Sequence, residues 1–187
     1  MNRNEINSAA TAEDITRAFF TRFSAEGLDK VSIGDVCSDC HISRTTFYRY
    51  FTDKFDVLEK KEQYLLNGTE NFSDSSLMFF AVDRGSKSVN PEFLHMLEFI
   101  KENMFYYKAI LSSNFSRRFM VKWSAQINDG IRGKMENADS GSNEFLLRTV
   151  SAGFLAGLSN WIEKEPGLSV AEVADIFSSI FSGTAAI

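Results

Sequence analysis

The pattern that most directly suggests chemistry is a pair of cysteines followed by a histidine, Cys37-Ser38-Asp39-Cys40-His41. Cys-x-x-Cys-His is the attachment signature of c-type haem, and Cys-x-x-Cys also serves thiol redox chemistry and metal binding. Haem attachment requires export, for which the chain shows no basic-then-apolar leader. A redox pair should open a helix after a strand, whereas this pair lies at the end of a predicted helix. We therefore expect both sulfurs to pack as small hydrophobic groups, with redox sensing and metal binding as alternatives.

A group of polar and aromatic side chains follows at once, with Arg44, Thr45, Tyr48 and Arg49 on one side of a short helical segment. Arg and Thr side chains bond to base edges in the major groove, and a Tyr hydroxyl can reach a phosphate. The competing interpretation is an ordinary solvated helix face. An exposed tyrosine between two arginines favours DNA reading.

Two short helices must position this face. The first carries apolar residues at one-face helical spacing: Ile33, Val36, Cys37 and Cys40. Ser32 stands in front of it as a capping residue. Ser43 is placed to cap a second helix that runs to Tyr50 and is buried through Phe47 and Phe51. This is the arrangement of a DNA-reading helix-turn-helix.

The stretch resembles the N-terminal domain of TetR-type transcriptional regulators through seven residues at the family's order and spacing: Ile42, Ser43, Thr46, Phe47, Tyr48, Phe51 and Lys54. That family usually has Ala-Gly in the turn, where this chain has Cys40 and His41. The turn tends to need a positive φ, which Gly adopts freely and His adopts at some cost.

Together the face and the resemblance predict a set of DNA contacts. Lys54 is expected on a phosphate, and Tyr50 either packs inside or touches the backbone of DNA. The full set is Ser32, Ser43, Arg44, Thr45, Thr46, Tyr48, Arg49, Tyr50 and Lys54. Residues 40–54 hold three basic residues against one acidic, whereas residues 1–60 hold eight against ten. A patch this local binds DNA weakly, so useful affinity needs two copies.

The rest of the chain reads as helical throughout. Of 187 residues 44% are hydrophobic, only two are proline, and apolar residues recur at helical spacing. The sequence predicts an all-α protein with a three-helix helix-turn-helix domain at 1–53 and a helical effector-binding and dimerisation domain at 54–187. Residues 1–11 read as a polar arm before a helix that ends at Gly27. No apolar run reaches the ~20 residues of a membrane span, so a cytoplasmic location is expected.

Aromatic residues concentrate in the second domain, where two interpretations remain open. One is an apolar effector pocket with a few polar groups that orient a ligand. The other is ordinary core packing, which is the commoner role for any single ring. The candidate pocket residues are His95, Phe99, Tyr106, Tyr107, Phe119, Trp123, Gln126 and Phe154.

The last two helices combine small and apolar faces, which resembles the four-helix dimer interface of TetR-type regulators. In the first of these helices, at 144–163, the helical period predicts that Phe145 and Phe154 face inward. The expected interface residues are Gly153, Gly157, Trp161, Val173, Ile176, Phe177 and Ile180. Residues 99–111 and 153–177 also resemble the C-terminal region of a TetR-type subgroup, some members of which act with dihydroxyacetone kinase operons.

The sequence thus predicts a homodimeric, ligand-responsive repressor that binds a palindromic operator. The alternative is a coactivator whose C-terminal domain binds a protein partner. No catalytic constellation is present, so an enzyme is a distant third possibility, and no cofactor or metal is expected. The effector is an unidentified small molecule or protein, and no membrane partner is expected.

Overall fold

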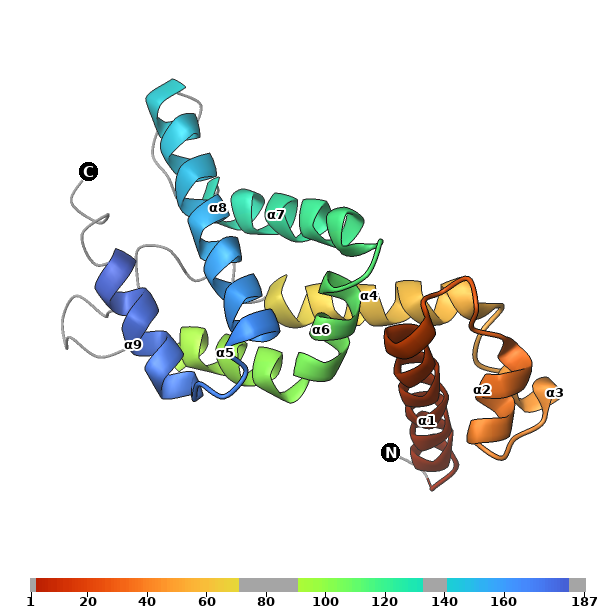
Figure 1. Ribbon diagram of the computed structural model, residues 1–187. Helices are drawn as coiled ribbons and strands as arrows, with labels where there is room; N and C mark the ends of the chain where they lie inside the picture. Colours follow the sequence, from red (N-terminus) through yellow and green to blue (C-terminus); the bar gives the residue numbers. More distant parts are fainter. Residues whose placement is uncertain (1–2, 71–90, 133–140, 182–187) are drawn as a thin grey trace. The chain divides into compact units, whose positions relative to one another are not determined.

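The computed structural model describes residues 3–70, 91–132 and 141–181, and every regular element in those ranges is an α-helix (Figure 1). The predicted all-α class is confirmed. The chain divides into two compact units, Met1–Tyr64 and Leu65–Ile187, each of which is described by itself. The division falls inside α4 (Lys54–Glu70), so one helix supplies residues to both units.

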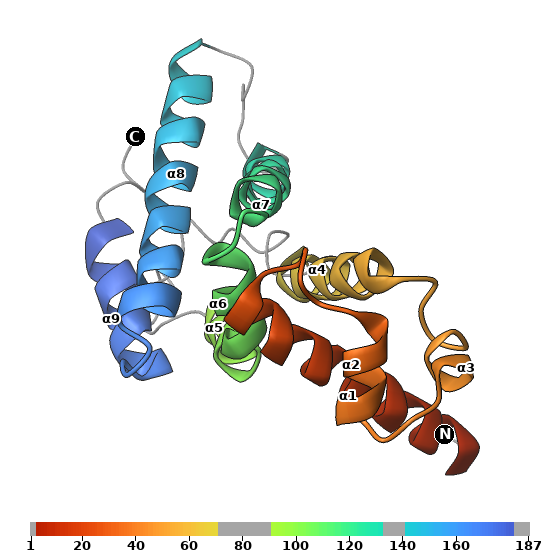
Figure 2. The same cartoon turned by 45° about the vertical axis from the view of Figure 1, so that its right-hand side comes forward.

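The first unit contains α1 (Arg3–Glu26), α2 (Ile33–Asp39), α3 (Arg44–Phe47) and the start of α4, and α2 packs against both α1 and α3 (Figure 2). Four α1 side chains contribute to its aromatic and aliphatic core: Ile15, Phe19, Phe20 and Phe23. The helix begins at Arg3, so the polar arm expected at 1–11 is wrong. Each residue added to a packed helix gains one hydrogen bond, which lets polar residues extend it.

The helices of this unit end and begin where local signals predict. Gly27 has a φ of +79° and its N–H donates to the Phe23 carbonyl at 3.0 Å, which ends α1. Ser32 Oγ accepts from the Asp35 N–H at 3.1 Å and caps α2. Asp53 Oδ1 accepts from two backbone N–H groups at 2.8 Å and caps α4.

The second unit contains α5 (Pro91–Glu102), α6 (Met104–Leu111), α7 (Ser116–Arg132), α8 (Gly141–Lys164) and α9 (Val170–Phe181). Its core is aromatic. Tyr107 stacks on Trp123 with ring centroids 5.3 Å apart, and Phe177 lies 5.0 Å from Phe154. Figures 1 and 2 both show α9 beside the C-terminal half of α8. Ser169 caps the start of α9, because its Oγ accepts from the Glu172 N–H at 3.2 Å.

A lysine holds the connection between α8 and α9 in place. Lys101 Nζ donates to the carbonyl oxygens of Pro166 and Leu168, and it lies 5.8 Å from the ring centroid of Trp161. Trp161 Nε1 also donates to the Leu168 carbonyl at 3.3 Å. Pro166 is exposed and Leu168 is partly buried, and the two side chains supply donors to the carbonyl groups of this turn.

In the ranges that the structure describes, no helix has the length and apolar character to cross a membrane. The same ranges hold no cluster of His, Cys, Asp or Glu that could hold a metal ion.

Candidate nucleic-acid interface

The turn between α2 and α3 reverses the chain at one residue of unusual conformation. His41 has a φ of +54°, which confirms the positive φ expected at this position. Its N–H donates to the Ser38 carbonyl at 3.2 Å, and the next N–H, of Ile42, donates to the Cys37 carbonyl at 3.0 Å. These two bonds satisfy carbonyls at the end of α2 and aim the chain into α3.

The start of α3 is capped by Ser43. Ser43 Oγ accepts from the Thr46 N–H at 3.0 Å and lies 2.9 Å from Thr46 Oγ1. Both hydroxyls are therefore engaged locally. The α-helix ends at Phe47 rather than at Tyr50, because the N–H groups of Arg49 and Tyr50 reach back only three residues. Such bonds tighten the segment into successive turns.

The segment has one buried and one exposed side. Phe47 and Phe51 are 1% and 6% exposed, and they anchor it in the core of the first unit. The opposite side forms a ridge of four exposed residues, here called the reading ridge: Arg44, Thr45, Tyr48 and Arg49. Tyr48 is 54% exposed, so its ring and hydroxyl are accessible to a partner.

A glycine in α2 makes room for the first residue of this ridge. A Cβ built on Gly34 would lie 2.8 Å from Nη2 of Arg44, so the guanidinium rests on the bare backbone at that point. This contact crosses from α3 to α2. Sequence reasoning missed it, because the only local signal is a glycine inside a helix.

The helix that carries Gly34 is tied to α1 by an ion pair. Arg22 donates twice to the carboxylate of Asp39, from Nε to Oδ2 at 2.5 Å and from Nη2 to Oδ1 at 2.8 Å. The hydrogen bonds from Arg22 lower the pKa of Asp39 below its ordinary value. The ion pair fixes the direction of α2, and Arg44 of the reading ridge contacts α2 at Gly34.

Two residues expected at the DNA have other contacts in the structure. Lys54 Nζ donates to the carbonyl oxygens of Leu28 at 2.8 Å and Val31 at 3.0 Å, which direct it into the loop before α2 rather than toward solvent. Tyr50 is half-buried, and hydrogen bonds with Ser8, the larger effect, and with Thr11 lower the pKa of its hydroxyl.

The two cysteines differ in their surroundings. Cys37 is buried, 4% exposed, whereas Cys40 is only partly buried and its Sγ lies 3.5 Å from the Asp14 carbonyl oxygen. Burial raises the pKa of both thiols. A raised pKa lowers the thiolate fraction that redox chemistry needs, which favours the packing role over the redox role.

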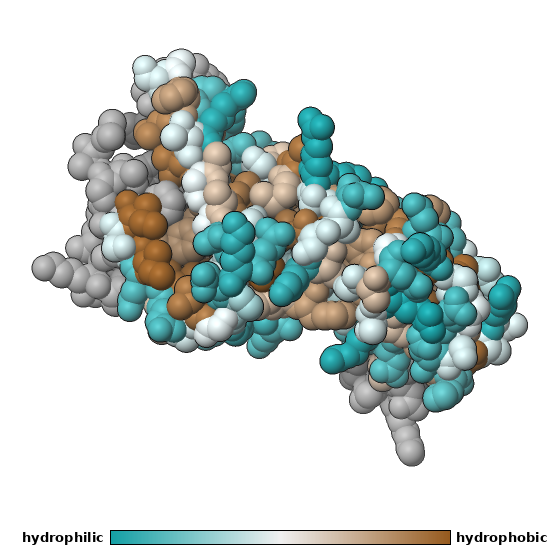
Figure 3. Space-filling model, viewed as in Figure 1, coloured by the Kyte–Doolittle hydropathy of each residue, from teal (hydrophilic) through white to brown (hydrophobic). Residues whose placement is uncertain are grey.

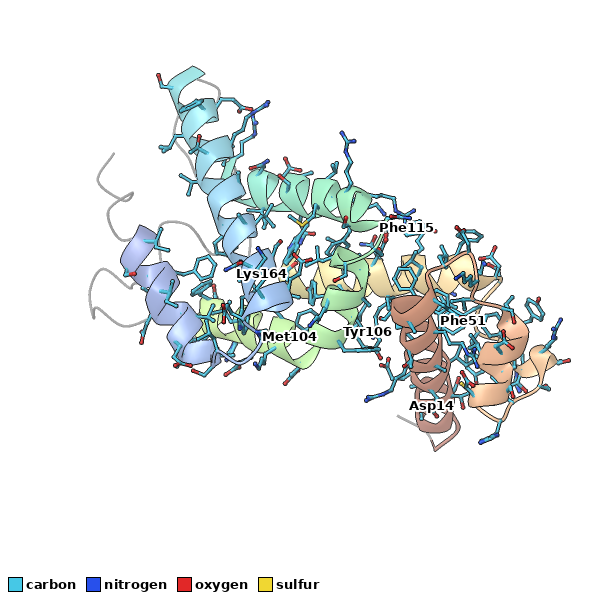
Figure 4. All side chains as sticks on the ribbon, in the orientation of Figure 1. Asp14, Phe51, Met104, Tyr106, Phe115 and Lys164 are labelled. Carbon is cyan, nitrogen blue, oxygen red and sulfur yellow. The ribbon has the colours of Figure 1, made fainter. Side chains whose placement is uncertain are left out.

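The structure brings three of the expected pocket residues together as packed rings: Tyr107, Phe119 and Trp123. Tyr106 and Phe154 are also buried in the second unit, but they contact other rings. Tyr106 lies on α6 (Figure 4). The polar groups bond to α4, since the Tyr107 hydroxyl donates to the Leu65 carbonyl and Gln126 Nε2 to the Leu66 carbonyl, both at 2.9 Å. Phe99 is partly exposed, and His95 lies on the exposed side of α5.

The expected dimer residues separate into two groups. Trp161, Val173 and Phe177 are 2–5% exposed, so their own chain already buries them. Gly157 faces Phe177 of the same chain, because a Cβ there would lie 2.7 Å from the Phe177 ring. By contrast Gly153 has nothing within 4 Å of a built Cβ, and Ile176 and Ile180 are 46% and 60% exposed.

The exposed group extends along α8 and α9. Ala152 and Ala156 are exposed beside Gly153, and Phe145, expected to face inward, is 73% exposed. Figure 3 shows strongly apolar side chains gathered over α9 on the face in view. We call this surface the α8–α9 face and define it by Phe145, Ala152, Gly153, Ala156, Ile176 and Ile180.

The capped α2–turn–α3 arrangement with an exposed reading ridge defines the helix-turn-helix class of regulators. Residues 9–60 match the family described as "Bacterial regulatory proteins, tetR family", and residues 87–183 match a TetR-type model described as "Transcriptional regulator C-terminal region". The second match covers more than half of the chain. The chain belongs to the TetR family of transcriptional regulators, which are transcription factors and not enzymes.

Similar proteins agree with this assignment. The HTH-type dhaKLM operon transcriptional activator DhaS of Lactococcus lactis is 22% identical over 142 residues, which are 73% of this chain and 68% of the relative. A solved structure titled dihydroxyacetone kinase operon activator DhaS has a TM-score of 0.60 at 21% identity, over 94% of this chain and 96% of its own. A TetR transcriptional regulator from Streptococcus agalactiae has a TM-score of 0.59 at 16% identity, over 95% and 97%. Both solved structures share the fold of this chain.

Proposed function

We propose that the protein binds a palindromic DNA operator as a homodimer, with the reading ridge in the major groove. The observation that carries this proposal is the exposure of Arg44, Thr45 and Tyr48 on a capped helix whose other side is buried. A guanidinium can bond to both acceptors of a guanine edge, a Thr methyl contacts thymine, and a Tyr hydroxyl bonds to phosphate. A chromosomal regulator of this kind acts in the cytoplasm.

The α8–α9 face supports the dimer. Its apolar and small side chains are exposed in a single chain, and burial between two copies would remove them from water. A two-fold axis through this face would also supply a second reading ridge. Two ridges about one helical turn apart, ~34 to 36 Å along the duplex or somewhat more, would read two half-sites.

For the effect on transcription we propose two candidates. The first is a ligand-responsive repressor, in which an effector in the second unit favours a conformation that cannot bind both half-sites. The second is an activator whose second unit binds a protein partner. The relative DhaS is named an activator, and the polar groups of Tyr107 and Gln126 already bond to α4 carbonyls. Both observations favour the second candidate.

Operator binding is tested by selecting bound sequences from a randomised duplex library with the full chain. We expect a palindrome to emerge. Arg44→Ala should then lose about 1 to 3 kcal/mol at the selected site and little on random duplex. Arg17→Ala is the matched control, since Arg17 is exposed on α1 outside the reading ridge. Equal losses on selected and random duplex for Arg44→Ala would remove the base-reading role.

The direction of regulation is tested separately by deleting the gene and measuring transcripts next to the selected sites. A rise in transcripts supports the repressor, and a fall supports the activator. The two outcomes leave the operator-binding result unaffected.

A further inference from the structure

The guanidinium of Arg44 lies against the backbone of α2 at Gly34. A Cβ built on Gly34 would lie 2.8 Å from Arg44 Nη2 and 3.7 Å from Arg44 Cζ, so a residue with a side chain would displace the guanidinium. The contact joins the first residue of α3 to the second residue of α2, and these helices pack together (Figures 1 and 2). The side chain that begins the reading ridge is therefore positioned by a second helix.

Two further observations describe the Arg44 guanidinium. Burial raises the pKa of the Cys37 thiol on α2, and the charge of Arg44 acts in the opposite direction, which agrees with a guanidinium close to this helix. Within the described ranges of the chain, no hydrogen bond or ion pair engages the guanidinium. Packing against Gly34 therefore holds it, and its N–H donors stay available to a partner.

We propose that Gly34 is a specificity-determining residue of the DNA interface, because it holds the Arg44 guanidinium where this group reads a guanine in each half-site. The inference rests on the proposed operator binding and deepens it. Two N–H groups of the guanidinium must meet the O6 and N7 acceptors of a guanine edge together, and hydrogen bonds weaken steeply when their angles change. A side chain at position 34 would shift the guanidinium and weaken this contact.

An arginine that is already held in place binds a guanine at a lower entropic cost. A freely exposed arginine samples many rotamers, and it loses this freedom when it binds. Contact with Gly34 restricts the Arg44 side chain before DNA arrives, so less freedom is lost on binding. Phosphate contacts elsewhere on the interface gain nothing from this restriction. Gly34 should therefore increase affinity for the operator and leave affinity for random sequence unchanged.

The fold of α2 does not itself require a glycine at this position. Gly27 is the one glycine with a positive φ among the described residues, so the backbone at Gly34 accepts alanine, which is the better helix former. The built Cβ lies 3.6 Å from Oγ of the capping Ser32, an ordinary van der Waals contact. The atom that must move is the end of the flexible Arg44 side chain. Gly34→Ala should therefore displace the guanidinium without harming α2.

Equilibrium binding of the full chain to the selected palindrome and to random duplex tests the proposal. We expect Gly34→Ala to bind the palindrome about fivefold or more weakly, and random duplex within about twofold of the wild type. Thermal unfolding should show equal or higher stability. Ser38→Ala is the matched control, because Ser38 is exposed on the same helix, and it should bind both duplexes normally. Lower stability of Gly34→Ala, or equal losses on the two duplexes, would overturn the proposal.

Two further measurements connect the loss to Arg44. Gly34→Ala should cost no further affinity in an Arg44→Ala protein, because the side chain that it displaces is absent. Selection from a randomised library should show that both single variants lose the preference for guanine at the same position of each half-site. A loss that persists in the double variant, or that falls at another position, would refute the role of Gly34. If Arg44→Ala alone kept the full preference for the palindrome, the base-reading function itself would fail, and the role of Gly34 with it.

Discussion

The ammonium of Lys54 lies 2.8 Å from the carbonyl oxygen of Leu28, a residue 26 positions earlier in the chain. It also donates to the carbonyl of Val31 at 3.0 Å, so it closes the loop between α1 and α2 from the first turn of α4. Sequence reasoning assigned this lysine to a DNA phosphate. Its contacts in the structure point to a role in positioning the helix-turn-helix.

Lys54→Met should therefore destabilise the first unit. Hydrogen bonds from a charged donor contribute about 1.5 to 3 kcal/mol each when they are partly buried, and we expect a total loss of about 1 to 3 kcal/mol because the methionine keeps the packing of the stem. Urea unfolding followed by circular dichroism measures it. Lys30→Met, an exposed lysine of the same loop, serves as the control. If Lys54→Met left stability unchanged and weakened binding to all DNA sequences alike, Lys54 would instead contact a DNA phosphate.

His41→Gly should stabilise the protein. A non-glycine residue at a φ of +54° pays about 1 to 3 kcal/mol of strain, and glycine removes the strain at an entropic cost of about 0.5 to 1 kcal/mol. The expected net gain is about 0.5 to 1 kcal/mol. Thermal unfolding measures the gain, and Ser38→Gly, an exposed position with ordinary helical φ, should instead lose stability. A loss with His41→Gly would show that the imidazole makes a stabilising contact.

Local signals were sufficient to predict the helix-turn-helix. Ser32 and Ser43 cap their helices through bonds to residues three positions later, and Gly27 and His41 adopt the positive φ that their turns require. Each of these features depends on a few neighbouring residues. The residue types alone therefore carry the information, and the exposed side of α3 follows from the burial of Phe47.

Long-range packing decided the features that sequence reasoning missed. The Lys54 contacts join residues more than 20 positions apart, and Gly157 is matched to Phe177 across the α8–α9 connection. The helical period placed Phe145 inward, but at the start of α8 it is 73% exposed. A periodic pattern shows which residues share a helix face, and it does not show which neighbour covers that face.

The ion pair between Arg22 and Asp39 should make stability depend on acid pH. The folded-state pKa of Asp39 is lowered, so its contribution to stability is present above the unfolded value of 3.8 and is lost as pH falls through the folded value. Asp39→Asn should lower stability near neutral pH and lose less additional stability on acidification. Urea midpoints across the acid range measure the difference. Asp29→Asn is the control. If the urea midpoints of Asp39→Asn and the wild type fell equally as the pH is lowered, the prediction would be wrong.

The last prediction separates the two glycines of α8. Gly157→Leu would place atoms against the Phe177 ring of the same chain, since even a Cβ would lie 2.7 Å away, so it should destabilise the second unit by about 1 to 3 kcal/mol. A Cβ built on Gly153 meets nothing within 4 Å in one chain, so Gly153→Arg should leave the helix content unchanged. If two copies meet at the α8–α9 face, the arginine would instead be buried in the interface.

Sedimentation equilibrium at micromolar concentration measures this outcome. We expect the wild type to be a dimer and Gly153→Arg to be a folded monomer that has lost affinity for the palindrome, because one reading ridge alone holds DNA weakly. Ala125→Arg, at an exposed position of α7, should remain a dimer with normal operator binding. A wild-type monomer, or a Gly153→Arg protein that dimerises and binds normally, would place the two-fold axis elsewhere on the second unit.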